Sequence, residues 1–260
     1  MSISFFRNRP NLRFGDRTLI EAGSSIANGM IGCWLFNEVI AAAPGYSLCL
    51  PADKVTLTSV TRVNNQYGNA LSFNGSSSYG KATPLATRFW QAQPISVRAI
   101  VNFTSVVGYQ PVIDYVNVNG YYGWDLCCST TIQFYIANSA GGPIDTVTGR
   151  TGVVGTWYDI IATDNGTTLS LYVNGILDNT HASGTAQWTS ALNVYWGSDR
   201  PEHAGPSYLT GLIAHTAVWN RCLTASEVKM LYTNPYCFLY AGAPFPSFVA
   251  GKPINQCAYV

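Results

Sequence analysis

The segment 156–180, TWYDIIATDNGTTLSLYVNGILDNT, constrains the fold of this 260-residue chain more than any other segment. Its three runs of strand-forming residues are separated by Asp-Asn-Gly at 164–166 and by Asn-Gly at 174–175. Asn-Gly favours the positive φ angles of a tight hairpin turn, so the segment is predicted to form three antiparallel strands in a meander. In the middle run, apolar residues at 169, 171 and 173 alternate with polar ones, which predicts one core face and one outer face.

Similar short runs recur along most of the chain. They are separated by turn sequences, among them Asn-Gly at 74–75 and 119–120 and Gly-Gly-Pro at 141–143. Strands this numerous, without helical segments between them, favour a sandwich over βαβ units. The predicted strands cover residues 70–73, 95–103, 109–118, 121–126, 131–137, 192–197 and 211–219.

One helix is predicted after the last of these strands. Thr224 is placed to cap the first turn while Glu227 reaches back to the cap, which is the pattern of a capping box. The helix is expected to reach Tyr232 and to stop before Asn-Pro at 234–235, because a residue that precedes proline disfavours helical backbone.

Composition excludes several classes of function. Hydrophobic residues make up 47% of the chain and charged residues 10%, which is far from the composition of a disordered protein. The net charge of +1 leaves no global electrostatic footprint for nucleic acid or for an anionic membrane. No window of 18 apolar residues exists, so no ordinary transmembrane helix is expected.

The first residues also lack the pattern of a secretory signal, namely an apolar stretch followed by a small-residue cleavage site. The chain is therefore expected to stay inside the cell that makes it. The seven cysteines are an odd number without the close pairs of a zinc site, so most are interpreted as small buried hydrophobes. A bridge between Cys222 and Cys237 is the alternative.

Two terminal segments differ from the rest of the chain. Residues 1–27 are interpreted as an N-terminal arm for an acidic partner, or as a solvated tail, because they carry the cluster Arg7, Arg9, Arg13 and Arg17. Residues 236–260 are rich in proline, glycine and aromatics without any period, so they are predicted to pack on their own sandwich or on a neighbouring subunit. The candidate contacts of this second arm are Tyr236, Phe238, Tyr240, Phe245 and Phe248.

The pieces between these arms, residues 28–235, resemble the LamG-like jelly-roll family of the concanavalin A-like superfamily. The resemblance implies an all-β fold, a two-sheet antiparallel jelly-roll sandwich with one short C-terminal helix. It also implies a binding module for sugars, proteins or lipids. The motifs that carry it are MIGCWLFNE at 30–38, GNALSFNG at 68–75, SSSY at 76–79, PISV at 94–97, GYY at 120–122, GTW at 155–157, LYVNG at 171–175, GLI at 211–213, WNR at 219–221 and the capped helix.

The family's calcium ligands are not matched here. Ser78 stands where the family usually carries an acidic residue, and Ile213 is followed by Ala214 where the family usually has Asp. Calcium takes six to eight oxygen ligands that commonly include carboxylates. We therefore expect neither calcium nor another metal, and no cofactor.

Catalysis is not expected either. Sandwich enzymes that cut β-glucans place two glutamates a few residues apart on one strand, as nucleophile and general acid. The only glutamates are Glu21, Glu38, Glu202 and Glu227, and no two are so spaced. The pair Asp199 and Glu202 lies in a loop and is interpreted as surface charge, and the three histidines fall in no zinc-ligand spacing.

Aromatic clusters carry the positive binding signal, since sugars pack their apolar faces on flat rings while polar neighbours orient the hydroxyls. The alternative is packing in the core or at a subunit interface, where tryptophan and tyrosine are also common. The candidate residues are Tyr121, Tyr122, Trp124 and Asp125 in one cluster, and Tyr195, Trp196, Asp199, Arg200 and His203 in another.

A lone jelly roll between two unusual arms is typical of a subunit in an assembly. The leading hypothesis is a non-catalytic bacteriophage virion protein, a capsid decoration or a tail-associated subunit. Its partners would be other virion proteins or its own copies, and its sandwich would touch host glycans. The alternatives are a free carbohydrate-binding module or adhesin, and a glycoside hydrolase.

Overall fold

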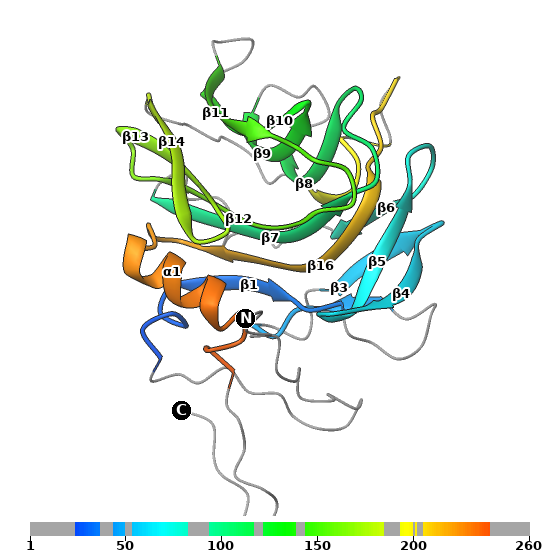
Figure 1. Ribbon diagram of the computed structural model, residues 1–260, viewed down its shortest axis with the longest axis horizontal. Helices are drawn as coiled ribbons and strands as arrows, with labels where there is room; N and C mark the ends of the chain where they lie inside the picture. Colours follow the sequence, from blue (N-terminus) through cyan, green and yellow to red (C-terminus); the bar gives the residue numbers. More distant parts are fainter. Residues whose placement is uncertain are drawn as a thin grey trace, which may run out of the picture.

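The computed structural model describes residues 24–36, 44–49, 54–82, 94–116, 122–138, 144–184, 193–199, 201 and 205–239, with backbone only at 116, 122, 138 and 144. Within these ranges the chain forms two antiparallel eight-stranded sheets that face each other and one short helix (Figure 1). The predicted all-β sandwich with one C-terminal helix is confirmed.

The first sheet, called sheet I, contains the predicted meander at one edge. Its strands pair in the order β14 (Ile176–Ala182), β13 (Thr168–Val173), β12 (Trp157–Asp164), β7 (Ile95–Phe103), β16 (Thr210–Trp219), β5 (Gly68–Asn74) and β4 (Thr61–Asn65), and β1 (Met30–Trp34) pairs with β16. The second sheet, called sheet II, has the order β11 (Ile144–Thr151), β10 (Thr131–Asn138), β9 (Tyr122–Ser129), β8 (Gln110–Val116), β15 (Asn193–Trp196), β6 (Tyr79–Ala82), β3 (Lys54–Thr58) and β2 (Gly45–Tyr46).

The main core lies between the two sheets. On β13, Leu169, Leu171 and Val173 are buried while their neighbours are half-buried, which confirms the predicted alternation. This core between the sheets also contains Trp124 of β9 and Trp196 of β15. Every residue of β7 is buried, because its other face is covered as well.

The helix covers the outer face of sheet I. Helix α1 (Ala225–Thr233) begins after Thr224, whose side chain accepts a hydrogen bond from the Glu227 amide while the Glu227 carboxylate accepts one from the Thr224 amide. This confirms the predicted capping box. Val228 and Leu231 of the helix are buried in a second apolar cluster with Trp219 of β16.

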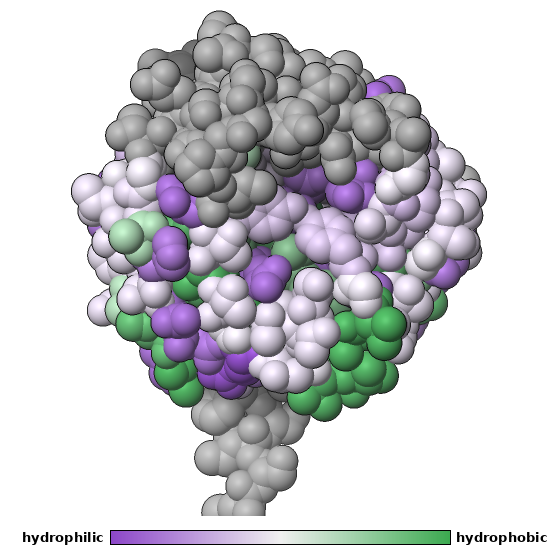
Figure 2. Space-filling view, turned by 90° about the horizontal axis from the view of Figure 1, so that it is seen from above, coloured by the Kyte–Doolittle hydropathy of each residue, from purple (hydrophilic) through white to green (hydrophobic). Residues whose placement is uncertain are grey.

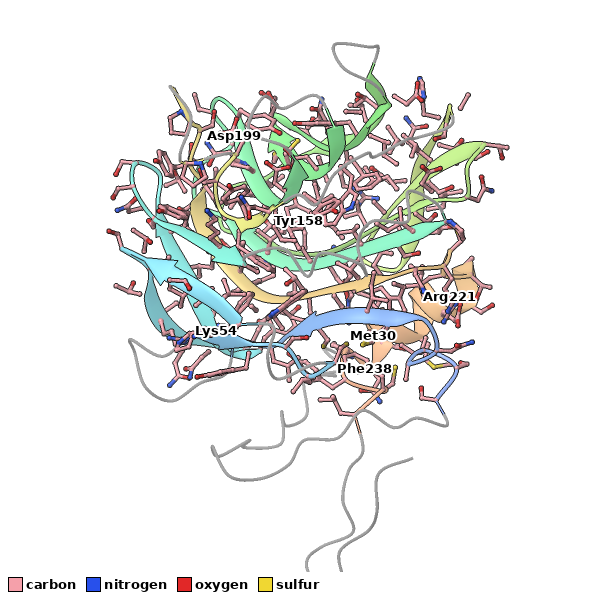
Figure 3. The ribbon with its side chains drawn as sticks, turned by 180° about the vertical axis from the view of Figure 1, so that it is seen from behind. Met30, Lys54, Tyr158, Asp199, Arg221 and Phe238 are labelled. Carbon is pink, nitrogen blue, oxygen red and sulfur yellow. The ribbon has the colours of Figure 1, made fainter. Side chains whose placement is uncertain are left out.

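Both ends of the described chain join this second cluster, through Ile26 and Phe238. Trp219 Nε1 donates a 2.7 Å hydrogen bond to the Ile26 carbonyl. Phe238 is fully buried and its ring stacks on His215 at a centroid distance of 5.9 Å. Figure 3 shows Phe238 beside Met30 on this side, with Asp199 at the opposite side of the sandwich. Residues 236–239 therefore pack on their own sandwich, and residues 1–23 and 240–260 lie outside the described ranges.

Candidate functional site

Trp124 is not available as a sugar platform. It is fully buried between the sheets, with its ring centroid 5.8 Å from that of Tyr115 and 6.4 Å from that of Phe134. Side chains alternate along a strand, so Trp124 points into the core while Asp125 points to the outer face of sheet II. The proposed cluster is corrected in this respect. Tyr121 and the side chain of Tyr122 lie outside the described part of the chain.

The second proposed cluster divides in the same way. Trp196 is a core residue whose ring lies 4.9 Å from that of Trp34, and its Nε1 donates a 2.9 Å hydrogen bond to Thr216 Oγ1. Tyr195 is on the outer face of sheet II but is also buried. The ammonium of Lys81 lies 5.8 Å from the centroid of its ring.

Asp199 occupies the rim of sheet II. It is half-buried, and its carboxylate accepts a hydrogen bond from the amide of Ser207. Burial raises the pKa of Tyr208 above its ordinary value, and Tyr79 and Asp199 raise it further, which places these groups close together. Arg200, Glu202 and His203 lie outside the residues that the structure describes.

The most ordered polar arrangement on this face is centred on Asp125. Tyr135 donates a 2.8 Å hydrogen bond to Asp125 Oδ2, and Tyr109 donates a second one to the same oxygen. The two hydroxyl oxygens also lie close to each other, but their two protons are used on Asp125. Asp125 is buried, whereas both tyrosines remain half-buried. A buried carboxylate therefore fixes two tyrosine hydroxyls at the outer face of sheet II.

Two strands and one loop bring these three residues together. Asp125 of β9 and Tyr135 of β10 are direct cross-strand partners. Tyr109 precedes β8, where the Gln110 side chain donates a 2.7 Å hydrogen bond to the Val107 carbonyl and accepts one from the Thr210 amide at 2.8 Å. These two hydrogen bonds tie the loop that carries Tyr109 to β16 of sheet I.

Burial and negative charge keep the two tyrosines protonated. Burial raises the pKa of Tyr135 far above its ordinary value, and Asp125 raises it further. The pKa values of Tyr109 and of the Cys127 thiol are raised by the same two causes in the same order. Both tyrosine hydroxyls thus keep their protons at neutral pH and donate them to Asp125, so that toward a ligand each hydroxyl oxygen can accept a hydrogen bond.

Asp125 and Tyr135 belong to a longer polar row that crosses sheet II at right angles to its strands. The members are successive cross-strand partners, so their side chains share the outer face. The middle three, Tyr195, Asp114 and Asp125, are buried, while the outer members are exposed or half-buried. The polar row consists of Thr56, Lys81, Tyr195, Asp114, Asp125, Tyr135 and Thr146 on β3, β6, β15, β8, β9, β10 and β11.

Figure 2 views the molecule from the side on which β8 to β11 lie in Figure 1. The described surface there is mostly hydrophilic or neutral, it is hollowed near its middle, and hydrophobic residues gather toward the rim. A surface of this kind suits a polar ligand with some apolar faces, which is the chemistry of a sugar.

Sequence reasoning missed three residues of this arrangement, Tyr109, Tyr135 and Asp114. All three lie in runs that were predicted as strands, but the contacts depend on which strands pair and in which register. The alternation of side chains along the strand at 122–129 could have been used to place Asp125 and Trp124 on opposite faces.

Metal ligation finds no support among the described side chains. No group of three or more His, Cys, Asp or Glu residues is arranged there to hold a metal ion. Asn74, at the turn where the family often holds calcium, uses its side-chain oxygen to accept hydrogen bonds from the amides of Ser76, Ser77 and Ser78. Within the described ranges, the structure also contains no helix that is long and apolar enough to span a membrane.

The assembly residues are only partly described. Tyr236 and Phe238 pack against His215 of their own sandwich. Arg7, Arg9, Arg13, Arg17, Tyr240, Phe245 and Phe248 lie outside the described ranges. All cysteines within those ranges are free thiols, so the alternative bridge between Cys222 and Cys237 is not formed.

A family profile described as the concanavalin A-like lectin/glucanases superfamily matches residues 74–229. The chain belongs to this superfamily. The matched range includes β6 to β16 and most of α1, and therefore the whole polar row except Thr56. No curated protein sequence matches the chain.

Solved structures show the same superfamily fold. The binding domain of botulinum neurotoxin serotype D superposes with a TM-score of 0.64 at 16% identity, covering 80% of this chain and 52% of the other. The binding domain of botulinum neurotoxin DC in complex with SialylT gives a TM-score of 0.63 at 12% identity with the same coverage. A botulinum neurotoxin type C structure gives 0.62 at 11% identity. The chain thus spans about half the length of the structures that it matches.

Proposed function

We propose that this chain is a non-catalytic glycan-binding domain and that its ligand contacts the outer face of sheet II. The observation that carries the proposal is the pair of tyrosines held on Asp125, whose half-buried rings and fixed hydroxyls lie on a polar face. Rings of this kind pack against the apolar faces of sugars, and pre-positioned hydroxyl oxygens lose little entropy when they accept hydrogen bonds from sugar hydroxyls.

Other members of the superfamily fold support a binding role. One neurotoxin binding domain was solved with SialylT, another with rat synaptotagmin II, and the type C structure concerns interaction with two ganglioside molecules. These ligands belong to the whole neurotoxin chains, of which this chain covers about half, and the shared fold is the support that they lend to a binding role. This chain shares the fold with them, and its own contact residues are those of the polar row and Tyr109.

The proposed role is non-catalytic, and the acidic residues that the structure describes support it. Glu227 is used in the helix cap and forms an ion pair with Arg221 at 2.7 Å. Asp114 and Asp125 are adjacent on the face but are both buried, which denies a scissile bond the close approach that a pair of catalytic carboxylates needs. Release of reducing sugar by the wild-type chain, lost in Asp125→Asn, would contradict this part of the proposal.

We further propose that the domain works as a virion component, with the arms fixing it to a bacteriophage particle. The support is the Arg-rich sequence before residue 24 and the aromatic sequence after residue 239. Because residues 24–27 and 236–239 pack on the sandwich, the test should remove only 1–23 or 240–260. We expect each truncation to stay folded and to fail to enter particles, whereas full incorporation of both would leave a free binding module or adhesin as the better account.

The direct test of binding is a glycan array with the full chain, followed by titration of the array hits against variants. Tyr135→Ala should weaken binding by about tenfold or more, since it removes both a ring and a fixed hydroxyl oxygen that accepts hydrogen bonds. The matched control is Tyr232→Ala, which removes an exposed tyrosine from α1 on the other side of the sandwich. Equal loss in both variants, or an array without hits, would count against the proposed site.

A further inference from the structure

Three connections between strands meet at one rim of the sandwich. They are residues 104–109 between β7 and β8, Thr130 between β9 and β10, and residues 152–156 between β11 and β12. The Thr130 amide donates a 3.2 Å hydrogen bond to the Val106 carbonyl, and the Thr130 carbonyl accepts one of 2.8 Å from the Gly152 amide. The three connections are therefore in contact, and together they are called the valine tip.

The valine tip exposes apolar side chains on an uncharged surface. Val107 is 81% exposed, and Val153 and Val154 are each 55% exposed. A Cβ atom added at Gly108 or at Gly155 would meet no other atom within 4 Å, so both loops project into open space. None of the residues of the tip is charged, and its polar side chains are all hydroxyls. Apolar side chains that gather at an exposed site in this way indicate an apolar partner.

The backbone of the valine tip is largely hydrogen-bonded within the chain. The Val153 amide, for example, donates a 2.9 Å hydrogen bond to the Tyr158 hydroxyl. A backbone group that enters lipid without a hydrogen-bond partner is costly, and internal partners remove that cost. The amides of the tip that have such partners are those of Thr104, Ser105, Val107, Thr130, Gly152, Val153, Gly155 and Thr156.

Half-buried aromatic rings lie on both sides of the valine tip. Tyr109 ends the first loop on the outer face of sheet II. Trp157 begins β12 on the outer face of sheet I, where its ring lies 5.1 Å from that of Tyr67. Tyrosine and tryptophan gather at the level of lipid headgroups, because each has an apolar body and a polar group. An apolar tip between two such rings matches the change in polarity with depth at the surface of a bilayer.

The small size of the valine tip argues against a second copy of this chain as its partner. A stable protein interface buries about 800 Å² on each side, and three valine side chains offer only a small part of that area. Contact with lipid needs no complementary surface, since its strength grows with the apolar area that is inserted.

We infer that the valine tip inserts into the interfacial region of a lipid bilayer, with the valines facing the acyl chains and Tyr109 and Trp157 at the level of the headgroups. Such a contact is shallow and needs no spanning helix. It goes beyond the proposed glycan binding and assigns a role to the rim instead of the polar row.

The test is flotation of the full chain with phosphatidylcholine vesicles that contain no glycolipid, so that glycan binding cannot contribute. Neutral lipid also gives no electrostatic attraction to the arginines before residue 24. Three valines carry fewer apolar carbons than a myristoyl chain, which binds at about 10⁴ M⁻¹, so half of the protein should bind at about 1 mM lipid or above. The absence of binding at about 10 mM lipid would overturn the inference and leave the glycan proposal untouched.

Serine substitutions locate the contact. Val107→Ser and Val154→Ser should each weaken vesicle binding by about tenfold, since each removes an inserted apolar side chain. Both positions are exposed, so thermal unfolding should be nearly unchanged. The matched control is Met230→Ser, which removes an exposed apolar side chain from α1 and should bind vesicles like the wild-type chain.

Two results with these variants would contradict lipid as the partner. One is vesicle binding that is the same in the double variant Val107→Ser, Val154→Ser and in the wild-type chain. The other is a dimer of the wild-type chain in light scattering that the double variant does not form, because a second copy would then cover the valine tip.

Discussion

Arg98 and Asp159 form a buried bidentate ion pair on the outer face of sheet I, with Arg98 Nε and one terminal nitrogen 2.8 and 2.6 Å from the two carboxylate oxygens. The remaining guanidinium donors reach the carbonyl oxygens of Leu231 and Pro235 at 3.1 and 3.0 Å. One arginine thus ties the end of α1, and the segment that follows it, to the centre of the sheet.

Arg98→Ala should lower the free energy of unfolding by about 3–5 kcal/mol, because it leaves the Asp159 carboxylate buried without its partner. Arg150→Ala is the matched control, since Arg150 pairs with Asp178 but keeps 44% of its side chain exposed, and it should cost less than about 1 kcal/mol. Denaturant unfolding of both variants measures the difference. Similar losses would show that burial does not distinguish the two pairs.

Trp124→Ala should lower the free energy of unfolding by about 3–5 kcal/mol, because it opens a cavity between the sheets. Trp124→Phe should cost less and should leave glycan affinity unchanged, since the ring of Trp124 does not reach the outer face. Thermal unfolding and titration on the same samples separate the two effects. A stable Trp124→Phe variant that loses its ligand would argue for a sugar platform at this tryptophan.

The sequence predicts on which face of its strand a residue lies, but it does not predict which residues of different strands meet. The alternation on 168–173, the Asn-Gly turns and the capping box at Thr224 were all predictable, because each depends on residues close in the chain. The same alternation separates Trp124 from Asp125 and Tyr195 from Trp196, so neither pair could have formed one aromatic platform. The meeting of Asp125 with Tyr109 and Tyr135 depends on long-range register, which one sequence does not reveal.

Glu227→Gln should destabilise the chain at neutral pH and have less effect in acid. Burial tends to raise the pKa of Glu227, but its hydrogen bonds with Arg221 and Thr224 outweigh burial and the net pKa is lowered. A lowered pKa in the folded state contributes stability above the ordinary glutamate pKa of about 4.3, and this is lost as pH falls through the folded value. Melting temperatures of the wild-type chain and of Glu227→Gln at pH 7 and pH 3 test this. If the two proteins differ by the same amount at both pH values, the prediction is contradicted.

Alkaline pH should lower the free energy of unfolding through the tyrosine on the outer face of sheet II. Burial and Asp125 raise the pKa of Tyr135, so the folded state keeps a proton that the unfolded state loses above about pH 10. Stability is therefore expected to fall as pH rises past that point, and less steeply in Tyr135→Phe, which has no hydroxyl to ionise. Denaturant unfolding between pH 8 and pH 11 gives the two slopes. Parallel slopes would show that this tyrosine does not contribute.

The most direct measurement is the map of backbone amide shifts in the full chain when a glycan hit is added. Ligand binding at the outer face of sheet II predicts the largest shifts in β9 and β10 around Asp125 and Tyr135. Shifts confined to α1 and β1, on the other side of the sandwich, would contradict the proposed site even if the glycan binds tightly.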